Sequence, residues 1–112
     1  MTPPRLRADL VARAILRQAG LDGRSAMLVR KGDADAGSIL VILLERDGSA
    51  VVLSQTRTAE GEAAWLRASG ETPLTPEETQ LYIERQTRFD PDIWVLELEA
   101  PGFRPPFEAT LV

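Results

Sequence analysis

The chain has 112 residues and a mass of 12.3 kDa, the size of one ordinary domain, and its 44% hydrophobic and 27% charged residues are typical of a globular protein. It contains neither cysteine nor histidine, which excludes disulfides, thiol catalysis, zinc–thiolate sites and every catalytic arrangement that needs an imidazole base. The net charge is −4, but residues 1–31 hold seven basic and two acidic side chains, whereas residues 32–112 hold six basic and fifteen acidic ones.

The sequence shows no segment that would direct the chain to or through a membrane. The longest apolar run, residues 39–44, is far too short to span a bilayer. Asp9 and Arg13 interrupt the N-terminal region, so it lacks the continuous apolar stretch of a signal peptide. A cytoplasmic protein is therefore expected.

Residues 5–19 are predicted to form an amphipathic helix, because apolar residues recur there at helical spacing. Gly20 is placed to end this helix in a left-handed conformation, which would let Leu21 contact Leu16. The stripe expected to face the core comprises Leu6, Leu10, Val11, Ala14, Ile15 and Ala19.

Three strands are predicted next, over residues 26–31, 38–46 and 49–55. Asp47-Gly48 between the second and third is typical of a two-residue type I′ hairpin turn. With that turn Leu44 would oppose Val51. One face would then carry Leu40, Ile42, Leu44, Val51 and Leu53, and the other Ile39, Val41, Leu43, Ala50 and Val52. Because both faces are apolar, this strand pair is expected in the middle of a sheet that is covered on both sides.

The remaining elements are a short edge strand at residues 63–68, a helix and a last strand at residues 93–99. Thr75, Pro76 and Glu78 form a capping box that starts the helix, which is expected to end near Arg88. The apolar residues of this helix are Leu81, Tyr82, Ile83 and Phe89. The C-terminal tail, residues 101–112, is rich in proline and is not expected to form regular structure.

These elements predict a single α+β domain over residues 1–112, with its core within residues 5–100. Its sheet of four to five strands would be mainly antiparallel, with two helices, in the order α-β-β-β-(β)-α-β. The two helices can shield one face of the sheet, or each can shield one. We expect either a homodimer or a face that is covered by the tail.

The first candidate site is the acidic loop at residues 32–37. Asp33 and Asp35 are suitable ligands for Mg²⁺ or Ca²⁺, which prefer carboxylate oxygens. The calcium-loop pattern fails, however, because its later ligand positions fall on Gly37 and Leu44. The favoured interpretation is a turn in which Gly32 and Gly37 supply unusual backbone angles and the aspartates make local hydrogen bonds.

The second candidate site is the segment at residues 88–94, RFDPDIW. If the last strand starts at the same end of the sheet as the acidic loop, the two segments would meet and their carboxylates could serve as acid and base or hold a cation. The candidate binding residues are Lys31, Asp33, Asp35, Arg88, Asp90 and Asp92, with Arg30 beside them. In the structural alternative, Arg88 faces the negative end of its helix, Phe89 and Trp94 fill the core, and residues 90–92 form a turn.

The third candidate is the basic side of the first helix, with Arg5, Arg13, Arg17 and Arg24. As a nucleic-acid surface it lacks nearby exposed aromatic side chains on which bases could stack. The negative net charge also opposes binding to phosphate backbones. A solvated helix face is the favoured interpretation.

The segments RKGDADAGSILV and RQTRFDPDIWVLELE together resemble a family of small bacterial proteins of unknown function, known as a conserved hypothetical domain. The shared patterns are R-G-D-x-D-A-G and R-F-D-P-D-x-W-V-x-E-x-E, and the likeness covers about residues 5–100. Lys31 stands where arginine is common, and a tryptophan often found near Leu10 is absent. The resemblance implies no activity, cofactor or catalytic residue.

Together these features favour a small non-catalytic binding or accessory protein of the cytoplasm, which would act on another protein or as a homodimer and would need no cofactor. The alternative is a divalent-metal-dependent enzyme that uses Mg²⁺ or Ca²⁺ held by Asp33, Asp35, Asp90 and Asp92. A weaker alternative is a nucleic-acid-associated protein. Whether the chain is an enzyme stays open, although the lack of histidine and cysteine favours a non-enzymatic role.

Overall fold

The computed structural model describes residues 6–112, which form two helices and one five-stranded sheet. The strand order is β1-β5-β2-β3-β4; β2 and β5 run parallel, and the other neighbours are antiparallel. The predicted α+β class, element order and mainly antiparallel sheet are confirmed. In chain order the elements are α1 (Ala8–Ala19), β1 (Ala26–Arg30), β2 (Ile39–Leu44), β3 (Ala50–Arg57), β4 (Ala63–Arg67), α2 (Pro76–Phe89), β5 (Trp94–Glu99) and the 3₁₀ turn η1 (Pro101–Phe103).

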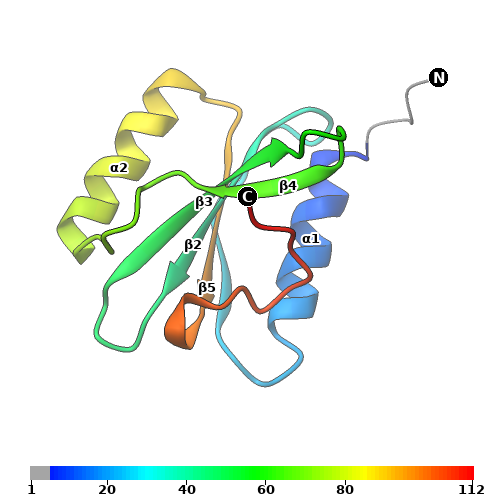
Figure 1. Cartoon of the computed structure of the whole chain (residues 1–112). Helices are drawn as coiled ribbons and strands as arrows, with labels where there is room; N and C mark the ends of the chain where they lie inside the picture. Colours follow the sequence, from blue (N-terminus) through cyan, green and yellow to red (C-terminus); the bar gives the residue numbers. More distant parts are fainter. Residues whose placement is uncertain (1–5) are drawn as a thin grey trace.

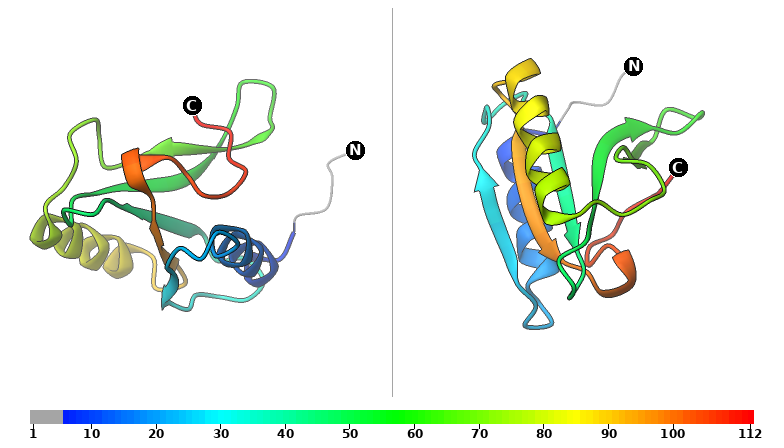
Figure 2. Two further views of the ribbon diagram at one scale, coloured as in Figure 1. Left: turned by 90° about the horizontal axis from the view of Figure 1, so that it is seen from below. Right: turned by 90° about the vertical axis from the view of Figure 1, so that its left-hand side faces the viewer.

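The two helices cover opposite faces of the sheet (Figures 1 and 2). On one face α1 packs over β1 and β5, and its buried residues belong to the same hydrophobic cluster as Val41 and Leu43 of β2. On the other face Tyr82 and Ile83 of α2 pack against Leu40, Ile42 and their neighbours. Both faces of β2 are therefore buried, as the predicted central position requires.

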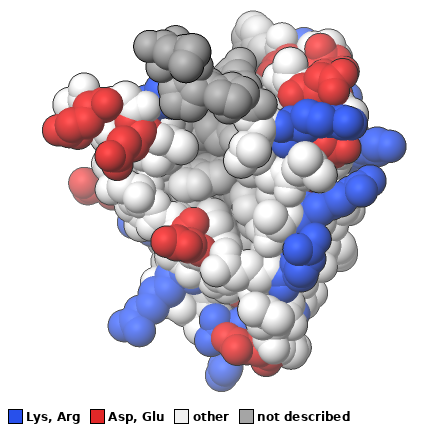
Figure 3. All heavy atoms as spheres, turned by 90° about the vertical axis from the view of Figure 1, so that its right-hand side faces the viewer, with Lys and Arg blue, Asp and Glu red and all other residues white. Residues whose placement is uncertain are grey.

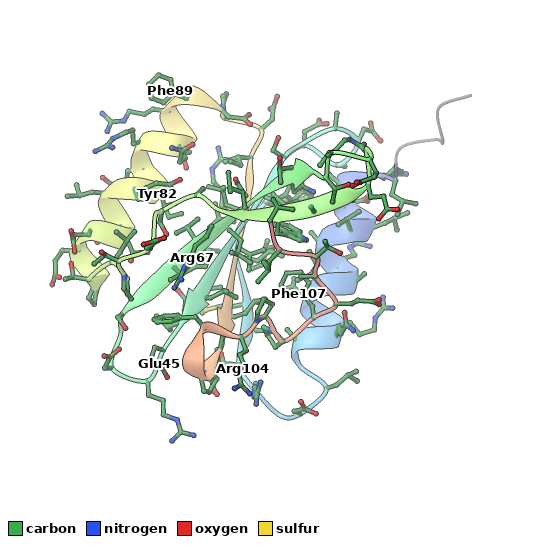
Figure 4. The ribbon with its side chains drawn as sticks, viewed as in Figure 1. Glu45, Arg67, Tyr82, Phe89, Arg104 and Phe107 are labelled. Atoms are coloured by element: carbon green, nitrogen blue, oxygen red, sulfur yellow. The ribbon has the colours of Figure 1, made fainter. Side chains whose placement is uncertain are left out.

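The C-terminal tail covers the part of the α1 face that lies beyond α1 (Figure 4). Phe107 is buried there, with its ring edge-on to that of Trp65 at a centroid distance of 5.6 Å. The Glu108 N–H donates a 3.0 Å hydrogen bond to Oε1 of Gln18, which ties the tail to α1. Phe107 thus belongs to the core, although it lies outside the predicted core range. Of the two predicted ways of covering the sheet, a homodimer or the C-terminal tail, the cover by the tail is observed.

The predicted register of the β2–β3 hairpin was wrong by one residue. Leu43 opposes Val51 and Val41 opposes Leu53, so β3 presents each side chain to the face opposite to the one predicted. The cause is the turn, because the Gly48 N–H bonds to the Glu45 carbonyl and only Gly48 in the loop has positive φ, at 88°. This is a type I turn followed by a glycine bulge, which adds a residue to the loop and so reverses the faces of β3.

The predicted contact face of α1 was partly wrong. Among the described residues the helix begins at Ala8 and buries small side chains, whereas Leu10 is 54% exposed. Alanines on the contact face let the helix axis approach the sheet more closely than leucines would. Its end also differs from the prediction, because Gly20 has φ −85° and the left-handed residue is Gly23. The buried residues of α1 are Ala8, Ala12, Ile15 and Ala19.

The start of α2 agrees with the sequence, but its apolar face is narrower than predicted. Thr75 and Glu78 make both hydrogen bonds of the capping box, at 3.1 and 3.0 Å. Leu81 and Phe89 are 58% and 82% exposed, so the expected place of Phe89 in the core was wrong (Figure 4). No helix within residues 6–112 is long and apolar enough to cross a membrane.

Candidate functional site

The two acidic segments meet at one end of the sheet, where β2 and β5 both begin. The Asp33 N–H donates to the Asp92 carbonyl at 2.9 Å, and the Trp94 indole N–H donates to the Asp33 carbonyl at 2.7 Å. Arg30 bridges the same region through a 2.7 Å hydrogen bond to the Ile93 carbonyl. The predicted meeting of the segments is therefore observed, and the contacts that join them involve the backbone.

The carboxylates of these segments cap their own turns. Asp33 Oδ2 accepts from the N–H groups of Asp35 and Ala36, at 3.2 and 2.8 Å, and Asp90 Oδ1 accepts from the Asp92 N–H at 3.1 Å. Asp35 instead forms an ion pair with Arg7, at 3.4 Å. Across residues 6–112 no three acidic side chains lie close enough to hold a metal ion together. The metal-site hypothesis remains a prediction that this geometry does not support.

Lys31 and Arg88 complete the predicted set, and both side chains are exposed. Neither forms an ion pair with an acidic side chain in the described part of the chain. Arg88 lies in the last turn of α2, where its positive charge faces the negative end of the helix dipole. Its placement agrees with the structural interpretation.

Gly32 and Gly37 are required at this joint for close approach, whereas the prediction of unusual backbone angles was wrong. Neither glycine has positive φ. A Cβ atom at Gly32 would lie 2.2 Å from the Asp92 carbonyl oxygen, and one at Gly37 would lie 2.4 Å from the same atom. Both glycines thus let the acidic loop press against the strand that begins at Trp94.

The acidic loop also holds the start of α1. The Ala8 and Asp9 N–H groups, which have no partner inside the helix, donate to the carbonyls of Asp35 and Ala34 at 3.2 and 3.0 Å. The loop therefore joins α1, β2 and β5 through backbone hydrogen bonds. This arrangement explains the composition of the loop without a ligand.

A shallow hollow of about 260 Å³ lies at the opposite end of the sheet. Glu97 and Glu99 of β5 line it. Glu45, which directly follows β2, lines it as well (Figure 4). The Glu45 carboxylate accepts from the N–H groups of Arg46 and Gly102, and these hydrogen bonds lower its pKa. The hydrogen bond from Gly102 shows that this carboxylate joins the hairpin to η1.

The outer edge of β1 is the feature that the sequence analysis did not identify as a candidate. β1 is the outermost strand, and within the described part of the chain it pairs only with β5 (Figure 2). Its three successive apolar side chains Met27, Leu28 and Val29 are 48%, 44% and 49% exposed. An exposed apolar edge strand offers unpaired backbone groups to another chain. The hydrophobicity of residues 26–29 was visible in the sequence, but their place at the margin follows only from the strand order.

The opposite edge of the sheet is closed by the tail of the same chain. The Trp65 N–H of β4 donates to the Thr110 carbonyl at 2.8 Å, and the Val112 N–H donates to the Trp65 carbonyl at 3.0 Å. Leu111 thereby forms a parallel bridge with Trp65. The two edges differ in that the tail covers one, whereas none of residues 6–112 pairs with the outer side of β1.

Basic side chains lie on α1 and at both ends of β1. Figure 3 views the side of the molecule on which α1 lies, and its lysine and arginine side chains form a column along one margin. The exposed cations that α1 and the two ends of β1 contribute are Arg13, Arg17, Arg24 and Lys31. None of them has an ion-pair partner among residues 6–112. We call these four residues with Met27, Leu28 and Val29 the β1 surface.

Comparison with known proteins places the chain in a family. The sequence profile of a family described as protein of unknown function (DUF1491) matches residues 6–108. The chain belongs to the DUF1491 family. This confirms that its relatives are proteins of unknown function, as the resemblance of the two acidic segments indicated. No curated protein matches the sequence.

Solved structures of similar proteins share the fold over almost the whole chain. A crystal structure of a DUF1491 family protein from Caulobacter crescentus CB15 is 34% identical, covers 96% of this chain and 100% of its own, and has a TM-score of 0.84. An NMR structure of a family protein from the same organism gives 34% identity, 98% and 99% coverage and a TM-score of 0.81. The solution structure of protein Atu0922 from A. tumefaciens is 26% identical, covers 97% of this chain and 96% of its own, and has a TM-score of 0.74.

Proposed function

We propose that this DUF1491 protein is a non-catalytic binding module that takes up an extended segment of a partner protein at the outer edge of β1. The observation that carries the proposal is the difference between the two edges of the sheet. The tail closes the β4 edge, whereas no described residue pairs with the outer side of β1, which presents three exposed apolar side chains in succession. Addition of a strand to an exposed sheet edge is a recurring mode of peptide recognition.

The backbone N–H and C=O groups of alternate β1 residues point outwards, as such pairing needs. The Glu99 N–H donates to the Ser25 carbonyl at 2.9 Å, so Ser25 and, two residues on, Met27 turn their backbone groups towards β5. The intervening residues Ala26 and Leu28 therefore turn theirs outwards. A bulge between Leu28 and Arg30 ends the regular part of the strand, so only a short stretch of its outer edge can pair with another strand.

The titratable groups support a role without catalysis. Within residues 6–112 the clearest shifts in pKa are those of Glu45 and Asp47, which are lowered, and of Tyr82, which is raised. Local turn hydrogen bonds cause the first two, and burial causes the third. A catalytic acid and base would be expected to converge on one pocket, and of these three groups only Glu45 lines the hollow described above.

The proposal includes a bacterial cytoplasmic setting. The relatives of known structure come from Caulobacter crescentus and A. tumefaciens, which are bacteria. The chain contains no cysteine, so an oxidising compartment would give it no stabilising disulfide. Fractionation of cells that express the chain from its own promoter tests this part of the proposal.

Site-specific photo-crosslinking in the native host tests the binding role. A photoreactive phenylalanine analogue replaces Leu28 on the β1 edge, and in a matched variant it replaces Leu81, an exposed leucine of α2 on the opposite face. We expect a discrete covalent adduct with one protein from the Leu28 position and none from Leu81. The same adducts from both positions, or no adduct from Leu28, would show that the β1 edge is not the binding site.

A further inference from the structure

We infer that the partner's segment is acidic: an extended stretch with a short apolar centre and aspartate or glutamate residues at its ends. This inference rests on the proposed function and adds the chemistry of the partner to it. It depends on the charges that border β1, on the position of α1 over the same margin, and on the shortness of the regular edge.

Both ends of β1 carry an exposed cation. Arg24 lies two residues before the strand and Lys31 directly follows it. A partner strand aligned with Ala26–Leu28 would place the residues that flank its centre beside these cations, since paired strands lie about 4.8 Å apart and rise about 3.3 Å per residue. Acidic flanks would therefore find opposite charges at each end of the pairing.

α1 contributes a further positive charge on the same side. Gln18 binds the tail on one flank of the helix. Successive residues of a helix are rotated by about 100°, so Arg13 and Leu16, five and two positions before Gln18, lie on the other flank. α1 packs over β1 and β5, whereas the tail covers β3 and β4, so the second flank faces the β1 margin. Arg13 is exposed on that flank.

Acidic side chains also lie near the two ends of β1: Asp33 follows Lys31 by two residues, and Glu99 is bonded to Ser25 beside Arg24. The Asp33 carboxylate already accepts hydrogen bonds from the Asp35 and Ala36 N–H groups. Among the described residues up to Lys31, six are basic and two acidic, and one of the acids, Asp9, is paired with Arg7 at 3.1 Å. Glu97 and Glu99 lie one strand further in, and Glu97 is aligned with Ile42, which faces α2. We therefore expect the acidic residues of the partner at the two ends of its segment and on the side that faces α1. On the side that faces α2, the side chains of the partner would meet Met27.

A second copy of the chain fits this edge less well than an acidic segment does. Antiparallel pairing of two β1 strands would bring two basic margins together, and like charges that face each other across an interface disfavour the pair. Because the bulge shortens the regular part of the β1 edge, backbone hydrogen bonds alone contribute little binding free energy. Attraction between opposite charges must therefore contribute to the affinity.

The test is an NMR titration of the ¹⁵N-labelled full chain with three synthetic peptides. All share the centre Val-Thr-Val-Thr-Val and differ in their ends, which are Asp-Glu, Ser-Gly or Lys-Arg. We expect the acidic peptide to shift the Ala26 and Leu28 amide signals and to bind about fivefold more tightly than the neutral one, with the basic peptide weakest. The preference for the acidic ends should fade at about 1 M salt, where the screening length is about 3 Å.

Matched variants separate charge from backbone pairing. The double variant Arg24→Glu with Lys31→Glu should reverse the order of affinity of the acidic and basic peptides. The double variant Arg57→Glu with Arg85→Glu changes the net charge by the same amount at positions outside β1, and it should leave the order of affinity unchanged. Leu28→Pro removes an outward N–H without removing a bond to β5, so it should abolish binding. Leu28→Ala measures the part of that loss that comes from the side chain.

The results distinguish a wrong partner chemistry from a wrong site. Equal binding of the acidic and neutral peptides at β1 would overturn the acidic partner and leave the binding edge in place. Shifts confined to signals outside β1 and α1, or no shift with any peptide at millimolar concentration, would overturn both. Shifts of β1 signals on concentrating the chain alone would make a second copy the occupant, and tighter binding of a single-stranded oligothymidylate would make it a nucleic acid.

Discussion

Single glycines in this chain serve two different physical purposes. Gly32 and Gly37 have ordinary backbone angles and are needed because the Asp92 carbonyl passes where a Cβ atom would lie. Gly48 is needed for the opposite reason, since its φ of 88° strains any residue that carries a Cβ atom. Sequence alone marks all three as turn residues. The purpose of each depends on what the rest of the fold places beside it.

Replacement of Gly32 by alanine tests the close-approach role. We expect Gly32→Ala to lower the free energy of unfolding by about 1–3 kcal/mol, because the new methyl group forces the loop away from β5. Gly20→Ala is the control, since Gly20 has helical angles and only ordinary contacts, and it should stabilise by about 0.4–1 kcal/mol. Urea unfolding of both variants measures the difference, and equal stabilities would contradict the assigned role.

Asp47 gives a pH prediction at the hairpin turn. Its pKa is lowered chiefly by the Ser49 hydroxyl and then by the Ser49 N–H, both of which donate to the carboxylate. Because the folded pKa lies below the unfolded one, these bonds add stability at neutral pH that is lost as the pH falls below about 4.

Ser49→Ala should raise the pKa of Asp47 towards its ordinary value in an NMR titration of the side-chain carboxyl. The pKa of Glu45 serves as an internal reference, since its largest causes are the hydrogen bonds from the Arg46 and Gly102 N–H groups, which the substitution leaves in place, and the charge of Asp47 affects it less. An Asp47 pKa that does not move in the variant would show that the hydroxyl has no such effect.

Whole elements were better predicted than their relative register. The capping box at Thr75 and the position of β2 in the sheet follow from local signals, which act within a few residues of the chain. The faces of β3 depend on whether the hairpin loop holds two or three residues, and Asp47-Gly48 is compatible with both. The contact face of α1 was similarly ambiguous, because its alanines and its leucines each form an apolar stripe.

Substitutions of Gly48 test the observed turn. Gly48→Ala should cost about 1–2 kcal/mol, the penalty for a left-handed residue with a side chain. Gly48→Asn should cost less, because asparagine tolerates this conformation, although both place a Cβ atom about 3.3 Å from Pro76. Thermal unfolding of the two variants gives the order, and an alanine variant as stable as wild type would contradict the bulged turn.

In the molecule as a whole, the tail decides which edge of the sheet is open. It covers the α1 face beside Trp65 and then pairs with β4, so residues near the C-terminus protect an edge that lies some forty-five positions earlier in the sequence. The β1 edge has no such cover from the described residues. The difference is a property of the assembled molecule, and both proposals depend on it.

Phe107 should anchor this tail. We expect Phe107→Ala to cost about 3 kcal/mol, the lower end of the range for buried phenylalanine, because the ring packs at the rim of the core. Leu111→Ala, at a residue that is 54% exposed, should change stability by no more than about 0.5 kcal/mol. Urea unfolding measures both, and a small loss for Phe107→Ala would show that the tail is not part of the cooperative unit.

The sequence by itself determined the class of fold, the elements and their order, and the absence of thiol and imidazole chemistry, because these follow from composition and from periodicity over a few residues. Only the tertiary structure decided that the carboxylates of the acidic segments cap turns, that β2 and β5 are parallel, and that β1 lies at an open margin. Each of these depends on segments far apart in the chain, and their pairing is set by the packing of the whole sheet, which no local pattern encodes.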